Sequence, residues 1–127
     1  MNTPHMNKTD FRSPCPLSSS LELIGDKWSL IIVRDLLMGK KTYSDFLSSP
    51  ENIASNVLIT RLKTLKEYGI IDLKKDKDRK NVKYYFLTEM GMGLLPVMAE
   101  LALWYEKYVF AEPDPLSQHL TNIIENS

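Results

Sequence analysis

The sequence predicts a mainly α-helical domain with one small β-hairpin, an α+β fold. Apolar residues recur at the three- and four-residue spacing of amphipathic helices before residue 69 and again after residue 88. The residues between these two regions alternate apolar and polar side chains, or are β-branched and aromatic, as in strands. The chain has 127 residues, of which 43% are hydrophobic, so we expect one domain with an ordinary core.

Glycine and proline separate the predicted helices that precede the hairpin. Residues 16–24 carry apolar side chains at spacings of four and three, and Gly25 follows in a plausible C′ position. Asp26 and Gly39 then bracket a second helix, which is apolar on more than one side. We expect this second helix to lie at the centre of the core.

A short helix over residues 43–49, stopped by Pro50, is predicted next. Residues 53–68 form the next predicted helix. Both Asn52 and Ser55 are residue types that cap a helix N-terminus, so two start positions remain open.

Beyond Gly69 the periodicity changes from that of a helix to that of strands. Residues 70–75 alternate, and residues 82–87 carry the β-branched and aromatic side chains of a second strand. The intervening residues 76–81 include no apolar side chain. We therefore expect a two-stranded hairpin with a long, charged and mobile loop.

From Thr88 the helical periodicity returns as a wide apolar stripe. Pro96 cannot donate to the helical ladder, so it either kinks this helix or starts a new segment. We expect a folded domain over residues 14–110, a flexible arm over residues 1–13, and a tail over residues 111–127 with room for a short helix.

Several classes of protein lack their signatures in this sequence. Cys15 is the single cysteine, and neither His5 nor His119 has neighbours at metal-ligand spacing, so we expect no disulfide and no metal site. The sequence shows neither a nucleophile with a matching general base nor a glycine-rich phosphate loop. We therefore expect no enzymatic activity and no cofactor. Without a long apolar run or a signal-peptide pattern, we expect a cytoplasmic protein with no membrane partner.

The formal net charge is zero, but the charges are unevenly distributed. Residues 1–55 hold 6 basic and 6 acidic residues, residues 56–83 hold 9 and 4, and residues 84–127 hold 1 and 6, which gives net charges of 0, +5 and −5. A locally positive segment attracts phosphate over a Debye length whatever the total charge. A solvated surface whose charges segregate by chance would give the same count.

The order helix, helix, short helix, helix, hairpin, helix is that of a winged helix-turn-helix. With Leu58 placed at 0° and each residue advancing 100°, Leu62 and Leu65 fall on the same side of the fourth helix. The opposite side gathers amide, hydroxyl and ammonium groups in the first two turns, where a recognition helix meets base edges. The predicted base-contacting residues are Ser55, Asn56, Thr60, Lys63 and Thr64.

A basic hairpin loop beside such a helix can act as a wing that follows the DNA backbone. The predicted phosphate-contacting residues are Arg61, Lys77, Arg79 and Lys80. Arg61 suits a packing role equally well, and Asp76 and Asp78 are placed to pair with the loop cations instead. An ordinary solvated helix face is the alternative reading of the polar side.

The chain resembles the HxlR-type winged-helix transcriptional regulators of bacteria, a branch close to the MarR-like regulators, in CPLSSSLELIGDKWSLIIVRDLLMGKKTYSDF, IASNVLITRLKTLKEYGII and YYFLTEMGMGLLPVMAELALWYEKY. The resemblance spans about residues 14–108. It implies a homodimer, formed by the first and last helices, on a pseudo-palindromic operator in double-stranded DNA. Ala54 stands where the family usually has a capping serine, and residues 76–81 lack the proline pair of many family wings. The implied dimer-interface residues are Leu17, Leu21, Leu101, Trp104, Tyr105 and Tyr108.

Cys15 is a candidate redox-sensing residue. Pro16 suits the first helical position, which places Cys15 at the N-cap, where unpaired N–H groups and the helix dipole stabilise a thiolate. The resemblance implies sensing of oxidants or electrophiles by an N-terminal cysteine in this context, sometimes by bridging two subunits. The alternative is a buried thiol that packs near the dimer seam.

The sequence therefore predicts a homodimeric, sequence-specific DNA-binding transcriptional regulator with an oxidant or small-molecule effector. Trp104, Tyr105 and Tyr108 either line an effector pocket between subunits or belong to the core. The alternative function is that of a winged-helix module that binds protein and does not recognise an operator.

Overall fold

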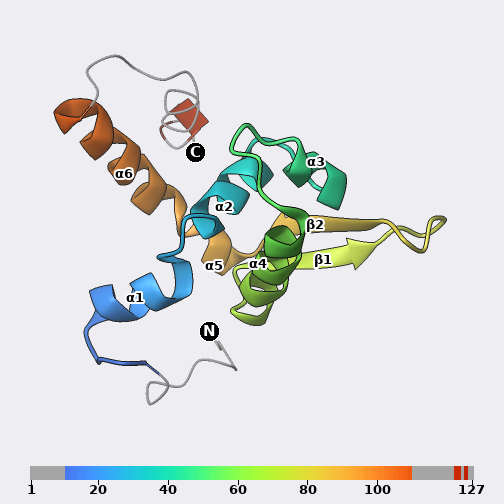
Figure 1. Ribbon diagram of the computed structural model, residues 1–127, viewed down its shortest axis with the longest axis horizontal. Coiled ribbons are helices and arrows are strands. Elements are labelled where there is room, and N and C mark those ends of the chain that lie inside the picture. Colours follow the sequence, from blue (N-terminus) through green and yellow to red (C-terminus); the bar gives the residue numbers. More distant parts are fainter. Residues whose placement is uncertain (1–10, 110–121, 124, 126–127) are drawn as a thin grey trace. The chain divides into compact units, whose positions relative to one another are not determined.

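A computed structural model describes residues 11–109, 122–123 and 125 of the chain (Figure 1). The chain divides into two compact units, one ending at Thr88 and one beginning at Glu89. The first unit contains helices α1 (Pro16–Ile24), α2 (Ser29–Leu37), α3 (Tyr43–Leu47) and α4 (Ser55–Glu67), and strands β1 (Ile71–Lys75) and β2 (Lys83–Leu87). The second unit contains α5 (Glu89–Met92) and α6 (Leu95–Tyr108). The predicted helical fold with one hairpin is confirmed.

The predicted arm over residues 1–13 and tail over residues 111–127 lie mostly outside the described residues. Residues 11–13 are described, and residues 122, 123 and 125 have helical backbone.

Helix α1 begins at Pro16 with Cys15 as its N-cap, as the sequence predicted. Cys15 has extended backbone angles, φ −63° and ψ 124°. Its carbonyl accepts the first helical hydrogen bond, from the N–H of Ser19 at 2.9 Å. Gly25 is the C-cap and keeps right-handed angles, so the expected C′ position is wrong by one residue.

Helix α4 ends in a Schellman motif that sets the direction of β1. The Ile70 N–H donates to the Leu65 carbonyl at 3.0 Å, and the Gly69 N–H donates to the Lys66 carbonyl at 3.0 Å. Gly69 has φ +81°, a left-handed conformation that glycine adopts without steric cost. Helix α2 ends in the same way at Gly39, with φ +97°. Both glycines therefore end helices, as predicted.

The start of α4 differs from the prediction. The helix begins at Ser55, two residues later than expected, and Ala54 is the N-cap without a side-chain acceptor. Neither predicted cap is used, and Asn52 turns the chain with φ +56°. Ile53 and Leu58 are both buried and occupy the N′ and N4 positions of a hydrophobic staple. Apolar burial therefore sets the start of α4 in place of a polar cap.

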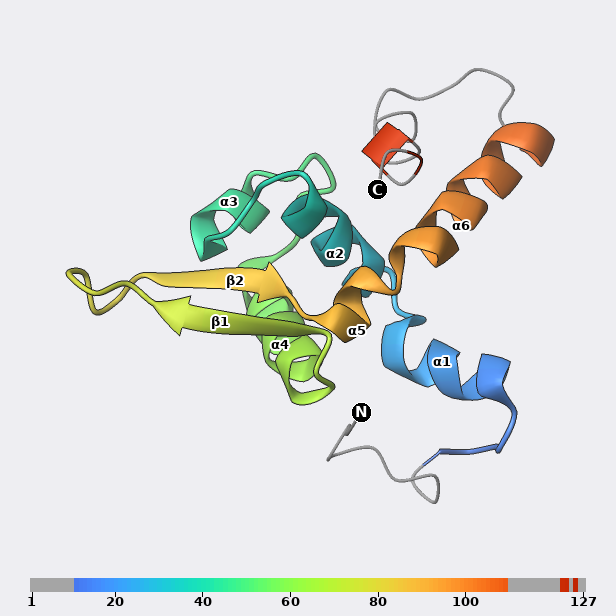
Figure 2. The same cartoon turned by 180° about the vertical axis from the view of Figure 1, so that it is seen from behind.

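Strands β1 and β2 pair antiparallel, with Ile71 opposite Leu87 and Lys75 opposite Lys83. The hairpin projects from the helices of the first unit, with its loop at the far end (Figure 2). The Tyr85 N–H donates to the Lys41 carbonyl at 2.8 Å, which ties β2 to the segment before α3. The predicted hairpin is confirmed.

The core of the first unit forms where α2, α3, α4 and the base of the hairpin meet. The Phe46 and Tyr85 rings pack edge to face, with centroids 6.0 Å apart. The buried apolar residues of this unit are Ile32, Val33, Phe46, Ile53, Leu58, Leu62, Leu65, Ile70 and Ile71.

In the second unit, Pro96 lies in the first turn of α6, whose N-cap is Leu94. A proline is tolerated there because the first N–H groups of a helix have no intrahelical partner. Of the two alternatives, Pro96 thus starts a new helix. Among the described residues, no helix combines the length and apolar composition that a bilayer-crossing segment needs.

Candidate DNA-binding interface

The predicted base-contacting residues lie on the outer side of α4. Leu58, Leu62 and Leu65 are at most 3% exposed, so the buried side is the one calculated from the helical periodicity. The Thr60 hydroxyl donates to the Asn56 carbonyl at 3.0 Å, which leaves its oxygen lone pairs as acceptors. The exposed members of the set are Ser55, Asn56, Thr60 and Lys63, and Thr64 is half-buried.

Arg61 ties α4 to the segment before α2. Its guanidinium lies 3.4 Å from the Asp26 carboxylate, and its side chain is only 26% exposed. Burial acts to raise the pKa of Asp26, but hydrogen bonds from Ser29 and the Trp28 N–H, together with Arg61, outweigh it and lower the pKa. Arg61 thus has the packing role that the sequence left open, and its phosphate contact stays a prediction.

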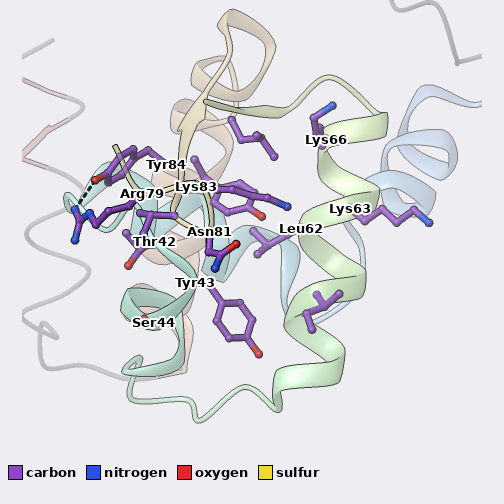
Figure 3. A pocket seen from close by; sticks show the side chains of 14 residues that line it. Thr42, Tyr43, Ser44, Leu62, Lys63, Lys66, Arg79, Asn81, Lys83 and Tyr84 are labelled. Carbon is purple, nitrogen blue, oxygen red and sulfur yellow. Dashed lines mark hydrogen bonds between the residues drawn. The ribbon is translucent and has the colours of Figure 1, made fainter. Parts of the chain in front are cut away.

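Asp76 organises the hairpin loop. Its carboxylate accepts the N–H groups of Arg79 at 2.8 Å and Asp78 at 3.1 Å, and the Tyr84 hydroxyl at 3.1 Å. These bonds, led by the Arg79 N–H, lower the pKa of Asp76. The Arg79 guanidinium donates to the Tyr84 hydroxyl at 3.1 Å (Figure 3). It also lies 3.7 Å from the Asp76 carboxylate. Arg79 therefore pairs within the loop, which is the alternative that the sequence left open.

The other two predicted wing cations differ from Arg79. Lys77 and Lys80 are exposed, and neither has a hydrogen bond or ion pair within the described part of the chain. Their ammonium groups are therefore available to an external anion, whereas Arg79 must first exchange its contacts inside the loop.

A cleft of about 960 Å³ lies between α4 and the hairpin (Figure 3). Its wall includes apolar and aromatic side chains from three elements, among them Tyr43 of α3, Ile59 of α4 and Tyr85 of β2. Burial raises the pKa of Tyr85. The cationic residues of the lining are Lys63, Lys66, Arg79 and Lys83. Within the described residues, the three lysines make no ion pair, so the cleft carries uncompensated positive charge.

Sequence reasoning missed part of this lining. On the helical wheel Lys66 falls near 80°, at the edge of the outer side, and Tyr43 lies on another helix. The spacing of residues within α4 carries no information about the hairpin that faces it. Only the angle of Lys66 was a usable signal.

A buried ionic network holds the turn before α4. The Arg34 guanidinium is bidentate to Glu51, at 2.7 and 2.8 Å, and also donates to Asp35 at 2.9 Å. The second Asp35 oxygen accepts the Ser49 hydroxyl and lies 3.8 Å from the Lys40 ammonium. Hydrogen bonds from Arg34 lower the pKa of Glu51, and those to Glu51 raise the pKa of Arg34.

The implied dimer-interface residues are exposed apolar side chains of α1 and α6. Leu17 and Leu21 of α1 are 68% and 50% exposed. The exposed fractions in α6 are 50% for Leu101, 58% for Trp104, 49% for Tyr105 and 69% for Tyr108. The three aromatic residues are therefore not core residues of the single chain. Apolar surface of this kind is typical of interaction sites.

Cys15 is exposed at the N-cap of α1. Its N–H donates to the Ser13 hydroxyl at 3.1 Å, and its sulfur makes no capping hydrogen bond. The thiol is thus not buried within the single chain, and burial at a dimer seam stays the alternative. In the described ranges, no group of His, Cys, Asp and Glu is arranged to hold a metal ion.

A helix that packs against α2 and α3 on one side, exposes polar residues on the other and is flanked by a basic hairpin defines a winged helix-turn-helix protein. The chain belongs to the HxlR-like helix-turn-helix family, whose model matches residues 23–113, and it is a transcriptional regulator of the winged-helix type.

Known relatives agree with this assignment. The chain is 34% identical over 94 residues to the uncharacterized HTH-type transcriptional regulator YdeP of Bacillus subtilis (strain 168). This alignment covers 74% of the chain and 73% of YdeP. The crystal structure of PA1607, a putative transcription factor, matches 81% of this chain and 70% of its own at 34% identity and a TM-score of 0.71. The redox regulator HypR in its reduced form matches 73% of this chain and 92% of its own at 28% identity and a TM-score of 0.67.

Proposed function

We propose that this regulator is a homodimer that binds a pseudo-palindromic operator in double-stranded DNA. The observation that carries the proposal is the outer side of α4, where Ser55, Asn56, Thr60 and Lys63 are exposed opposite a fully buried leucine side. An α-helix fits the major groove, and amide, hydroxyl and ammonium groups match the hydrogen-bonding pattern of base edges there.

The cleft beside α4 supports the same docking. A helix in the major groove and a hairpin loop beside it are separated by one sugar-phosphate strand. The unpaired ammonium groups of Lys66 and Lys83 line the space that such a strand would occupy, and Lys63 lies where this space borders the base-reading side of α4. Phosphate contacts position a protein on the duplex and make its affinity depend on salt. Lys77 and Lys80 extend these contacts along the hairpin loop.

A second copy of the chain is proposed as the partner of the exposed apolar faces of α1 and α6. A two-fold dimer presents two recognition helices to two half-sites, so the symmetry of the operator follows that of the protein. The alternative, a module that binds only protein, would not need the cationic cleft.

Salt dependence tests the proposal. Between 50 and 200 mM salt, we expect the affinity for the region upstream of the regulator's own gene to fall roughly a thousandfold, the loss typical of six or more phosphate contacts. Lys63→Ala is expected to lower the preference for this region over random DNA by about tenfold or more, because one base contact is lost in each half-site. Fluorescence anisotropy with labelled duplexes measures both effects.

Lys107→Ala is the matched control, since Lys107 is an exposed lysine of α6 and belongs to neither α4 nor the hairpin. It should leave the preference unchanged. If wild type and Lys63→Ala bind upstream and random DNA with equal affinity, base reading by α4 is excluded.

Cys15 is proposed as the oxidant sensor of the dimer. Its thiol is exposed at the start of α1, whose Leu17 and Leu21 belong to the proposed interface. Two Cys15 thiols, one from each protomer, would form a disulfide with loss of two protons and two electrons, which reduce diamide to its hydrazine. The bond would fix the relative positions of the two α1 helices and so alter the spacing of the recognition helices.

With diamide, we expect a severalfold change in the operator affinity of wild type and a covalent dimer on a non-reducing gel. Dithiothreitol should reverse both. Cys15→Ser is expected to bind the operator like the reduced wild type and to ignore diamide. The same response in wild type and in Cys15→Ser would remove this residue from the mechanism.

A further inference from the structure

One apolar side chain is exposed on α4. Ile59 is 57% exposed, whereas every other exposed residue of this helix is polar or charged. Those residues are Ser55, Asn56, Thr60, Lys63, Lys66 and Glu67. Ile59 is the fifth residue of α4, so it lies in the half that a recognition helix presents to the bases.

On α4, Ile59 lies between the proposed base-reading side and the cleft that faces the hairpin. On the wheel that places Leu58 at 0°, Ile59 falls at 100° and Lys63 at 140°. Ile59 and Lys63 are four residues apart and therefore neighbours on the helix surface. Both also line the cleft that faces the hairpin. Ile59 thus lies at the border between the base-reading side of α4 and the cleft.

The fold does not need this side chain. The inner side of α4 is formed by Leu58, Leu62 and Leu65, which are at most 3% exposed. Ile59 is 57% exposed and therefore contributes much less to the core than these leucines do. An exposed isoleucine gains free energy only when a partner covers its methyl groups. Isoleucine in a helix also has one strongly preferred χ1 rotamer, so it loses little entropy when it is covered.

Base edges in the major groove offer one apolar group, the 5-methyl of thymine. The oxygen, nitrogen and N–H groups there are hydrogen-bond acceptors or donors, which an aliphatic side chain cannot satisfy. We infer that Ile59 contacts a thymine 5-methyl in each operator half-site and thereby specifies an A·T pair at that position. The inference rests on the proposed operator binding and adds a residue and a base to it.

The test removes the methyl group without changing any hydrogen bond. An operator is first selected from random duplexes with the wild-type protein. Each thymine of a half-site is then replaced, one at a time, by deoxyuridine, which keeps the pairing edge and the charge. At one thymine we expect wild type to bind about three- to tenfold more weakly, the effect of losing one buried methyl group.

Ile59→Ala is expected to bind the thymine and deoxyuridine operators equally. Lys66→Ala is the matched control, because it lies two turns further along α4 on the same side and lines the same cleft. It should weaken binding to both operators by the same factor and keep the thymine preference. Thermal melting of Ile59→Ala should match that of wild type.

Failure of the proposed function and failure of this inference alone would give different results. If wild type selects no operator and its affinity for DNA does not fall with salt, the proposed function itself is wrong. If wild type binds a selected operator but loses no affinity at any deoxyuridine, or if Ile59→Ala keeps the thymine preference, this inference alone is overturned.

Discussion

Replacing Arg34 with leucine is expected to lower the free energy of unfolding by about 3–5 kcal/mol. The Arg34 side chain is 8% exposed and that of Asp35 is 4% exposed, so the variant leaves a buried carboxylate without its main cationic partner. Urea denaturation at one fixed protein concentration measures the loss, because the stability of a dimer depends on concentration. An unchanged midpoint would show that the network contributes nothing to stability.

Arg34→Lys is the comparison variant. Lysine keeps the positive charge but cannot present the planar fork that donates to both Glu51 oxygens at 2.7 and 2.8 Å. Its loss of stability should therefore be smaller than that of Arg34→Leu. Equal losses would mean that geometry, and not charge, accounts for the whole effect.

The Glu51 part of the network also predicts a pH dependence. Arg34 lowers the pKa of Glu51 below its ordinary value of 4.5. A carboxylate with a lowered pKa in the folded state stabilises the fold above its unfolded pKa, and this contribution is lost as the pH falls through the folded value. Wild type should thus exceed Glu51→Gln in stability at neutral pH, and the difference should shrink below about pH 4.5.

Trp104→Glu is expected to convert the proposed dimer into a monomer. Trp104 is 58% exposed on the apolar side of α6, and a carboxylate there would have to be buried without a partner in the proposed interface. A monomer binds one half-site at a time, so operator affinity should fall at least a hundredfold. Analytical ultracentrifugation measures the first effect and fluorescence anisotropy the second.

Leu103→Glu is the matched control for this prediction. Leu103 is 43% exposed on the same helix, but it lies about 100° from Trp104 and outside the proposed interface. It should stay dimeric and bind the operator. If Trp104→Glu also remains a dimer, α6 is not the dimer interface.

Several elements could be predicted from the sequence because their causes are local. Gly69 ends α4 and Cys15 caps α1, each through backbone geometry within a few residues, whereas at Pro96 the sequence left a kink and a helix start both open. The start of α4 could not be predicted in this way. Polar cap residues at positions 52 and 55 pointed to two starts, while the burial of Ile53, which depends on the rest of the core, decided the outcome.

The residues of the candidate site also differ in whether the sequence could predict them. The outer side of α4 follows from a 100° rotation per residue, so its polar residues were found from sequence alone. The cleft and the acidic partners of Arg34 and Arg61 were not. Arg34 lies 17 residues from Glu51, and the Asp26 that pairs with Arg61 belongs to another segment, so no local spacing reveals either pair.

The sequence by itself determined the order of helices and strands and the polar side of α4, since periodicity and helix ends depend on neighbouring residues. Only the tertiary structure decided which cations are available to an anion. Arg34 and Arg61 have acidic partners in distant segments of the chain, whereas Lys63, Lys66, Lys77, Lys80 and Lys83 have none within the described residues. The physical reason is that an ion pair needs two charges within about 4 Å, and folding alone brings them together.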